Sequence, residues 1–204
     1  MSGRIAFLLS GSGSTLRNLL AEIDAGRVAG EVVVVISDRP RVGGLDIARE
    51  AGIDAVVVAR KEHKGFEVYS EAIGEALAPY DADLVVSGGF LTLFKIPDAL
   101  ENRMVNVHPS LLPAFGGKGC WGDHVHTQVL ASGVRFTGCT VHFVTDVVDG
   151  GPIVDQAVVE VKDDDTTASL AARVQAAERE LYPRCIAGIL DGSIRLENGR
   201  VVRS

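Results

Sequence analysis

Cysteine is scarce in this chain, which has three cysteines among its 204 residues. The number is odd, the three are widely separated and no Cys-x-x-Cys pair is present, which argues against a disulfide framework and fits the reduced thiols of a cytoplasmic protein. Aromatic residues are also few, at 5%, but the 47% of hydrophobic residues is enough for a sizeable core. The length then favours one globular domain spanning residues 1–204.

Long apolar runs and an excess of positive charge are both missing. No run reaches the roughly 18 residues of a membrane-spanning helix, and the stretch from Met1 to Leu9 is too short for a secretory leader. The 27 Asp and Glu residues outnumber the 20 Lys and Arg residues, which gives a net charge of −7. A broad basic face for nucleic acid is therefore not expected. We expect a cytoplasmic protein that binds small molecules and contacts neither membranes nor nucleic acids.

A metal site is not expected either. Cys120, His124 and His126 are residue types that bind zinc, but their spacing supplies no clear fourth ligand and matches no finger or zincin pattern. The glycine-rich segment Phe115–Gly122 is typical of a mobile loop, with Trp121 as a candidate lid residue, or of a plain structural loop.

Short apolar runs alternate with helix-like stretches over the N-terminal part of the chain. Runs this short and continuous are typical of strands buried on both faces of a parallel sheet, and apolar residues at three- and four-residue spacing indicate helices. The predicted strands are Ile5–Leu9, Val32–Ile36, Ala55–Val58 and Leu84–Val86, and the predicted helices are 16–23, Gly44–Ala51 and Phe66–Leu77. This order predicts an α/β, Rossmann-like fold: a mostly parallel sheet flanked by helices, with ligands at the carboxyl ends of the strands.

The pattern changes in the second half of the chain. Met104–Val107 is predicted as a fifth strand, Thr140–Val144 as a sixth, and Ile153–Val161 as a longer, antiparallel one. A helix is predicted from Thr166 to Leu181, after a run of acidic residues. The sheet should therefore carry an antiparallel C-terminal extension.

A segment rich in glycine and serine joins the first predicted strand to the first helix. Gly11 and Gly13 would let backbone N–H groups converge on an anion, beside Ser12, Ser14 and Thr15 at the positive end of the helix dipole. The segment is neither a Walker A loop nor a complete dinucleotide fingerprint. It predicts a phosphate site, with a Ser-capped turn that binds nothing as the alternative.

Asp38 ends the second predicted strand. An acidic residue at this position binds ribose hydroxyls in dinucleotide-binding folds. Because the glycine fingerprint is incomplete, we favour a solvated turn carboxylate.

Asn106, His108 and Asp149 supply an amide, an imidazole and a carboxylate. Asn106 and His108 are two apart, so on an extended segment both side chains point to one face. An amide and an imidazolium can stabilise the oxyanion of a tetrahedral intermediate, and a carboxylate favours the charged imidazolium. The alternatives are a structural histidine and, because Asp149 stands in Asp-Gly-Gly, a plain turn residue.

With these motifs the chain resembles the phosphoribosylglycinamide formyltransferases, folate-dependent enzymes of purine biosynthesis. The resemblance covers almost the whole chain. Its segments, in order, are Leu9–Ser14, Gly89-Phe90, Asn106–Pro113, Thr140–Thr145, Asp149–Gly151 and Arg173–Gln175 leading to Glu178. So many matches in order are far more specific than one glycine loop.

The resemblance implies two small-molecule substrates, glycinamide ribonucleotide and the cosubstrate 10-formyltetrahydrofolate, and it allows a homodimer. The N-terminal half would bind the phosphate, and the C-terminal half would carry the folate and catalytic loops. The residues implied for the ribonucleotide are Gly11, Ser12, Gly13, Ser14, Thr15, Gln175 and Glu178. Those implied for the folate are Leu91, Thr92, Leu93, Phe94, Asn106, Thr145, Asp146, Val147, Val148 and Asp149.

The implied reaction is a direct attack of the amine on the formyl carbon, with no covalent enzyme intermediate and no metal. Asn106 and protonated His108 would stabilise the oxyanion, while Asp149 supports His108 and helps relay the proton. Thr140 and His142 are implied as supporting residues, although a histidine on an alternating strand can equally be structural.

Three features depart from many members of this family. Many members have an Arg where this chain has Thr92, and many place an Arg that meets the folate tail near the position of Phe66. The loop Ala114–Asp123 is also longer than in many members. Which residues contact the folate tail is therefore not predicted, and Lys61 or Lys64 could replace the Arg there.

Two other functions stay open. A formyltetrahydrofolate hydrolase would use the same three groups to direct water at the formyl carbon, but family hydrolases usually carry an additional N-terminal domain, whereas this chain begins directly with the first strand. A non-catalytic regulatory domain that binds a phosphate ligand would keep the architecture without turnover.

Overall fold

The structure, a computed structural model, describes residues 2–204. Met1 begins the segment Met1–Leu9, which is predicted to be too short for a secretory leader, and it lies outside the described residues. The chain forms two compact units, Met1–Val105 and Asn106–Ser204. No helix within residues 2–204 combines the length and the hydropathy needed to cross a membrane.

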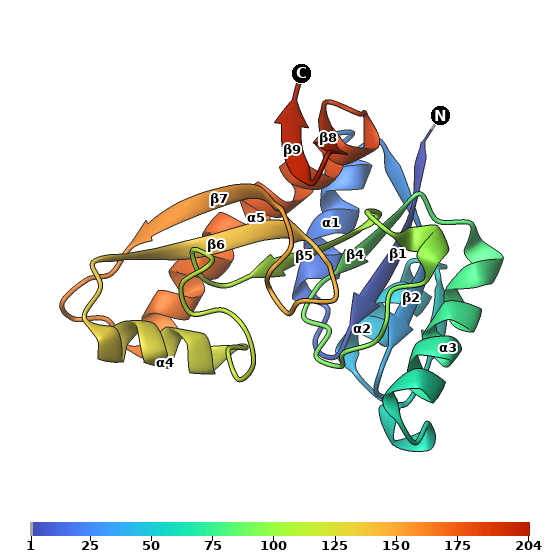
Figure 1. Cartoon of the computed structure of the whole chain (residues 1–204), viewed down its shortest axis with the longest axis horizontal. Helices are drawn as coiled ribbons and strands as arrows, with labels where there is room; N and C mark the ends of the chain where they lie inside the picture. The colour runs from blue at the N-terminus through green and yellow to red at the C-terminus, as the bar shows by residue number, and fades with distance from the viewer. Residues whose placement is uncertain (1) are drawn as a thin grey trace. The chain divides into compact units, whose positions relative to one another are not determined.

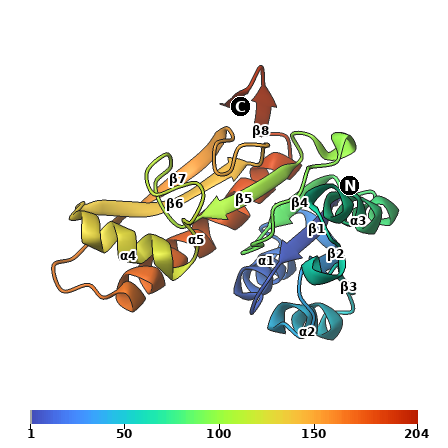
Figure 2. The same ribbon diagram turned by 60° about the horizontal axis from the view of Figure 1, so that its bottom comes forward.

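The first unit alternates strands and helices, as predicted. Its elements are β1 (Gly3–Leu9), α1 (Ser14–Asp24), β2 (Gly30–Ser37), α2 (Gly43–Glu50), β3 (Asp54–Val57), α3 (Phe66–Leu77) and β4 (Leu84–Ser87), with short 3-10 turns at Arg60–Glu62, Ala78–Tyr80 and Asp98–Leu100. The four strands are parallel in the order β3-β2-β1-β4. Figure 2 shows α1 and α2 on one face of these strands and α3 on the other. This is the arrangement that right-handed crossovers produce.

Burial in the first unit follows the apolar runs with one exception. Every residue from Ile5 to Leu9 in β1 is fully buried, as expected of a central strand covered on both faces. β3 was also predicted as buried on both faces, and this is wrong: its residues are half-buried or exposed. The reason is its position, because β3 is the end strand of the sheet.

The second unit carries the antiparallel part of the fold. β5 (Met104–His108) begins at its boundary, followed by α4 (Asp123–Ser132), β6 (Phe136–Phe143), β7 (Ile153–Glu160), α5 (Thr167–Leu190), β8 (Ile194–Glu197) and β9 (Arg200–Arg203). β6 and β7 pair antiparallel, and α5 lies along them (Figure 1). The seven-stranded sheet has the order β3-β2-β1-β4-β5-β6-β7, and β8 and β9 form a separate sheet. The predicted α/β fold, mostly parallel with an antiparallel C-terminal extension, is confirmed.

The last helix is longer than predicted. It does not end at Leu181 but continues to Leu190, with Pro183 inside it. Proline removes one backbone N–H donor and usually bends or ends a helix. Here Leu181, Tyr182, Cys185 and Ile186 are all nearly or fully buried on either side of the proline, so packing favours continuation.

The start of α5 is held by a network around Asp165. Its carboxylate accepts hydrogen bonds from Arg173 Nη1 at 2.9 Å, from Ser169 Oγ at 2.7 Å and from the Lys162 N–H at 2.8 Å. Thr166 adds a capping box with Ser169. The hydrogen bond from Arg173 is the main cause that holds the pKa of Asp165 well below its ordinary value of 3.8.

We expect Asp165→Asn to unfold at a lower urea concentration than the parent protein at pH 7. A carboxyl whose pKa is depressed in the folded state stabilises the protein above the ordinary pKa, and this stabilisation is lost as the pH falls through the folded value. The difference between variant and parent should therefore shrink below pH 3.8. Asp98→Asn, at an exposed carboxylate 4.0 Å from Lys95, is the matched control with little expected effect. An equal difference at pH 7 and pH 3 would contradict this explanation.

Candidate active site

β5 places Asn106 and His108 on the same side of one strand, as predicted from their spacing. Asn106 is half-buried and His108 is 4% exposed. The strand ends at His108, and the following loop contains a cis peptide bond between Leu112 and Pro113. His108 therefore lies at the end of β5, next to this loop, and Asn106 lies two residues before it.

Both ring nitrogens of His108 face hydrogen-bond acceptors. Nδ1 lies 3.5 Å from Asp149 Oδ2, and Nε2 lies 2.8 Å from the backbone oxygen of Phe115. A carbonyl oxygen cannot donate, so Nε2 is the nitrogen that donates to Phe115. Nδ1 is left facing the Asp149 carboxylate.

Asp149 is positioned by an unusual backbone and by the loop opposite. Its φ of 54° lies in the left-handed region, which Asp and Asn tolerate better than most residues. A Cβ on Gly151 would lie 1.8 Å from the Phe143 oxygen, so the end of the Asp-Gly-Gly turn admits only glycine. The Gly117 N–H donates to Asp149 Oδ2 at 2.8 Å. Asp149 is therefore a turn residue whose carboxylate is directed at His108.

His142 links Asn106 to Asp149. Its Nε2 is 3.3 Å from Asn106 Nδ2 and 3.7 Å from Asp149 Oδ1, and its Nδ1 is 2.9 Å from the Phe143 oxygen. Burial lowers the pKa of His142, which is 2% exposed, so the ring is neutral near pH 7. Nδ1 then carries the proton, and the lone pair of Nε2 accepts from the Asn106 amide. The ring thereby fixes which way the amide points.

We expect His142→Phe to lower kcat by roughly 3- to 10-fold, the equivalent of one net hydrogen bond, because Asn106 loses the acceptor that orients it. His142→Gln offers an amide oxygen in its place and should recover part of the loss. The pH profile of kcat should keep its shape in both variants, since a neutral His142 contributes no ionisation near pH 7. A profile that loses an ionisation in His142→Phe would contradict the positioning role.

Thr140 holds the loop that follows β5. Its hydroxyl donates to the Ser110 oxygen at 2.7 Å and accepts from the Leu112 N–H at 3.0 Å. Gln156 Nε2 donates to the same hydroxyl at 2.9 Å and to the Leu112 oxygen at 3.0 Å. Thr140 therefore supports the backbone beside the site.

The glycine-rich segment of the first unit is a tight loop packed against α2. Gly13, at the N-terminus of α1, has φ 78°, and a Cβ there would meet the Gly44 Cα at 2.5 Å. The Gly44 N–H donates to the Gly11 oxygen at 3.1 Å. The N-cap residue of α1 is Gly13 rather than a serine. Gly11, Ser12 and Ser14 are exposed, and Thr15 is half-buried.

The other residues predicted to bind substrates lie in both units. In the first unit, Leu91 and Leu93 are exposed, whereas Thr92 and Phe94 are half-buried. In the second unit, Thr145, Asp146, Val147 and Val148 form an exposed loop directly before Asp149. Gln175 and Glu178 are three residues apart on α5, which puts them on neighbouring positions of one helix face.

The prediction that Asp38 is a solvated turn carboxylate is wrong. The residue follows β2 directly, is 4% exposed, and accepts a hydrogen bond from Thr92 Oγ1 at 2.6 Å. The sequence around it gives no sign of this burial, because the partner is 54 residues away.

Two contacts of the site were not predicted from the sequence. The Phe115 oxygen on His108 and the Gly117 N–H on Asp149 are backbone groups, which no side-chain motif reveals. The only signal is Gly116 between them: a Cβ there would lie 2.5 Å from Leu112 Cδ2 and 3.4 Å from Asp149 Cβ. The loop 114–123 thus contacts the site through its backbone.

Among residues 2–204 no three His, Cys, Asp or Glu side chains converge as metal ligands would. His126 is buried on α4, His124 stacks edge-on against Trp121 with ring centroids 4.5 Å apart, and Cys120 Sγ is 3.6 Å from Gln128 Oε1. Burial lowers the pKa of His126.

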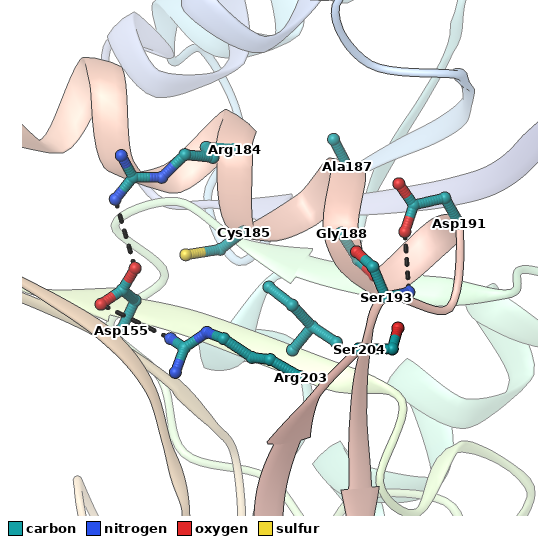
Figure 3. A pocket seen from close by; sticks show the side chains of 10 residues that line it. Asp155, Arg184, Cys185, Ala187, Gly188, Asp191, Ser193, Arg203 and Ser204 are labelled. Carbon is teal, nitrogen blue, oxygen red and sulfur yellow. Dashed lines mark hydrogen bonds and ion pairs between the residues drawn. The ribbon is translucent and has the colours of Figure 1, made fainter.

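A cavity of about 370 Å³ lies between the C-terminal half of α5, β7 and the β8–β9 hairpin. Figure 3 shows Asp155 between two guanidinium groups: Arg184 Nη2 is 3.2 Å and Arg203 Nη2 is 3.5 Å from its carboxylate oxygens. None of the residues singled out from the sequence lines it. The ion pairs connect the hairpin to β7 and α5, which is a structural role.

The chain as a whole is similar to several known proteins. A family model described as "Formyl transferase" matches residues 3–186. The trifunctional purine biosynthetic protein adenosine-3 of Bos taurus is 40% identical over 97% of this chain, which spans 19% of that protein's length. The phosphoribosylglycinamide formyltransferase of Escherichia coli (strain K12) is 34% identical, with 94% of this chain and 89% of that protein aligned. The crystal structure of glycinamide ribonucleotide transformylase 1 from Symbiobacterium toebii superposes with a TM-score of 0.90 at 41% identity, covering 98% of this chain and 93% of that one.

Proposed function

The chain belongs to the formyl transferase family, among the phosphoribosylglycinamide formyltransferases, and from this we propose that it transfers the formyl group of 10-formyltetrahydrofolate to the amine of glycinamide ribonucleotide in purine biosynthesis. The observation that carries the proposal is the cluster of Asn106, His108, His142 and Asp149, which is connected by distances of 3.3–3.7 Å.

Asn106 is well suited to bind a developing oxyanion. Its amide nitrogen has two hydrogens, and one of them is directed at His142 Nε2. The second remains for the formyl oxygen, which becomes negatively charged when the amine attacks the carbon. A donor that is already oriented stabilises this charge without reorganising during the reaction.

His108 is the second oxyanion donor, but its Nε2–H is bonded to the Phe115 oxygen in this structure. Asp149 faces the other nitrogen. For His108 to donate to the formyl oxygen, that oxygen has to take the place of the Phe115 carbonyl. A small shift of the loop 114–117 is therefore part of the proposal.

Asp149 assists the proton transfer. As the new carbon–nitrogen bond forms, the amine nitrogen must lose a proton, and the folate nitrogen must gain one when its bond to the formyl carbon breaks. The Asp149 carboxylate lies between the His108 and His142 rings, where it can accept a proton and pass it on. No covalent intermediate with the enzyme is needed.

Residues outside the cluster would bind the two substrates. The backbone of Gly11, Ser12, Gly13, Ser14 and Thr15 would hold the phosphate, since the N-terminus of α1 favours an anion. Gln175 and Glu178 would approach the ribose and the glycinamide, and the segments 91–94 and 145–149 would line the formyl and pterin side of the folate.

The test is a spectrophotometric assay with both substrates, run beside controls that lack the ribonucleotide. Loss of the formyl donor that depends on the ribonucleotide, together with formylated product, is the expected result. Donor loss without the ribonucleotide would indicate a hydrolase instead. Binding of both ligands without any turnover would indicate a regulatory domain.

A further inference from the structure

The segment 88–96, which follows β4 in the first unit, has no regular secondary structure but is fixed by side chains from elsewhere in that unit. Ser10 Oγ accepts from the Leu91 N–H at 2.9 Å, and Ser70 Oγ accepts from the Lys95 N–H at 2.8 Å. The Ser10 N–H donates to the Gly89 oxygen at 3.1 Å. The backbone on both sides of Thr92 is therefore anchored.

The remaining anchor is Asp38, which binds the Thr92 side chain itself. Thr92 Oγ1 donates to Asp38 Oδ2 at 2.6 Å, a short hydrogen bond to a carboxylate. The Asp38 side chain is 2% exposed, and its other oxygen forms an ion pair with Arg39 Nε at 3.6 Å. Within the described residues, 2–204, this oxygen accepts no hydrogen bond. A carboxylate that is buried and incompletely bonded is unfavourable for stability, so its presence at this position points to a role.

Tyr69 closes the other side of this cluster. Its buried hydroxyl lies close to the Thr92 hydroxyl, but among residues 2–204 no group meets full hydrogen-bond geometry with it. Burial, and then the charge of Asp38, raise the pKa of Tyr69 far above its ordinary value. The phenol therefore stays protonated beside the carboxylate, and Thr92 is the group that Asp38 binds.

We propose that Asp38 is a positioning residue for the folate: through Thr92 it fixes the backbone of residues 91–94 in the conformation that receives the cosubstrate. This inference rests on the proposed function, in which that segment lines the folate site. Because the Thr92 side chain is directed at Asp38, the segment presents its backbone and the exposed side chains of Leu91 and Leu93.

The test measures dissociation constants by calorimetry for two ligands, a stable 10-formyl folate analogue and glycinamide ribonucleotide. In Thr92→Val, which keeps the shape and loses the hydroxyl, Kd for the folate analogue should rise about tenfold or more, as expected for one lost hydrogen bond to a charged group. Kd for the ribonucleotide should stay within about twofold, because the 11–15 loop does not depend on this bond. Thr92→Ser, which keeps the hydroxyl, should restore folate binding.

A double variant separates positioning from general destabilisation. If Asp38 acts through Thr92, the double variant Asp38→Ala with Thr92→Val should have the same Kd for the folate analogue as the single variant with the higher Kd, or a lower one. Additive losses, an unchanged folate Kd in Thr92→Val, or equal weakening of both ligands with a lower melting temperature would each overturn the positioning role. If the parent protein itself does not bind the folate analogue, the proposed function fails, and this inference fails with it.

Discussion

Replacing Asn106 with Ala is expected to lower kcat by about 10²–10³-fold, the usual effect of removing one oxyanion donor. The amide is held by His142 at 3.3 Å, so its second N–H is already directed before substrate binds. Alanine leaves the developing charge with His108 as its remaining donor. KM for both substrates should change far less than kcat, because the lost interaction is strongest in the transition state.

A second substitution at the same position separates chemistry from packing. Asn106→Asp keeps the size and shape of the side chain but replaces the N–H donors with acceptors. We expect it to be at least as inactive as Asn106→Ala, with an unchanged circular dichroism spectrum. A rate within about threefold of the parent protein in Asn106→Ala, with correct folding, would exclude the oxyanion role.

The elements that could be predicted are those with a strong apolar period. α3 has the predicted bounds Phe66–Leu77, and its buried residues include Tyr69, Ile73 and Leu77, at four-residue spacing. The strands β1, β2 and β4 were predicted because their buried residues are nearly continuous. In these segments the local sequence and the tertiary burial favour the same structure.

Two elements were not predicted, α4 because its apolar pattern is weak and the β8–β9 hairpin because its turn sequence was not considered. α4 buries only Val125, His126 and Val129, which is too short a pattern to distinguish from a loop. The β8–β9 hairpin had a usable signal in Asn198-Gly199, where φ is 50° and 74°. An Asn-Gly pair with two positive φ angles is typical of a two-residue hairpin turn.

The site itself was predictable as a set of residues but not as a set of contacts. Asn106, His108 and Asp149 were selected for their chemistry, and the structure brings them together with His142. That His142 lies between Asn106 and Asp149 depends on contacts between separate segments of the chain, since Asn106 is 36 residues away from His142 in the sequence. No local sequence pattern encodes such a contact.

The largest loss is expected for Asp149→Asn, which should lower kcat by about 10²–10⁴-fold, the range for a group that takes part in proton transfer. Asparagine tolerates the left-handed φ of 54° at this position and can still accept from the Gly117 N–H, so the turn should survive. What disappears is the negative charge 3.5 Å from His108 and the ability to accept a proton.

The matched control is Asp98→Asn, the same chemical change at a carboxylate whose side chain is 97% exposed, with parental kcat expected. Urea unfolding of both variants checks that the loss in Asp149→Asn is not a folding defect. Asp149→Glu moves the charge by one methylene, and it should recover activity only in part, since the proton must travel between fixed groups. If Asp149→Asn keeps most of the parental rate, the carboxylate has no part in the chemistry, and its proximity to both histidines merely fixes the turn.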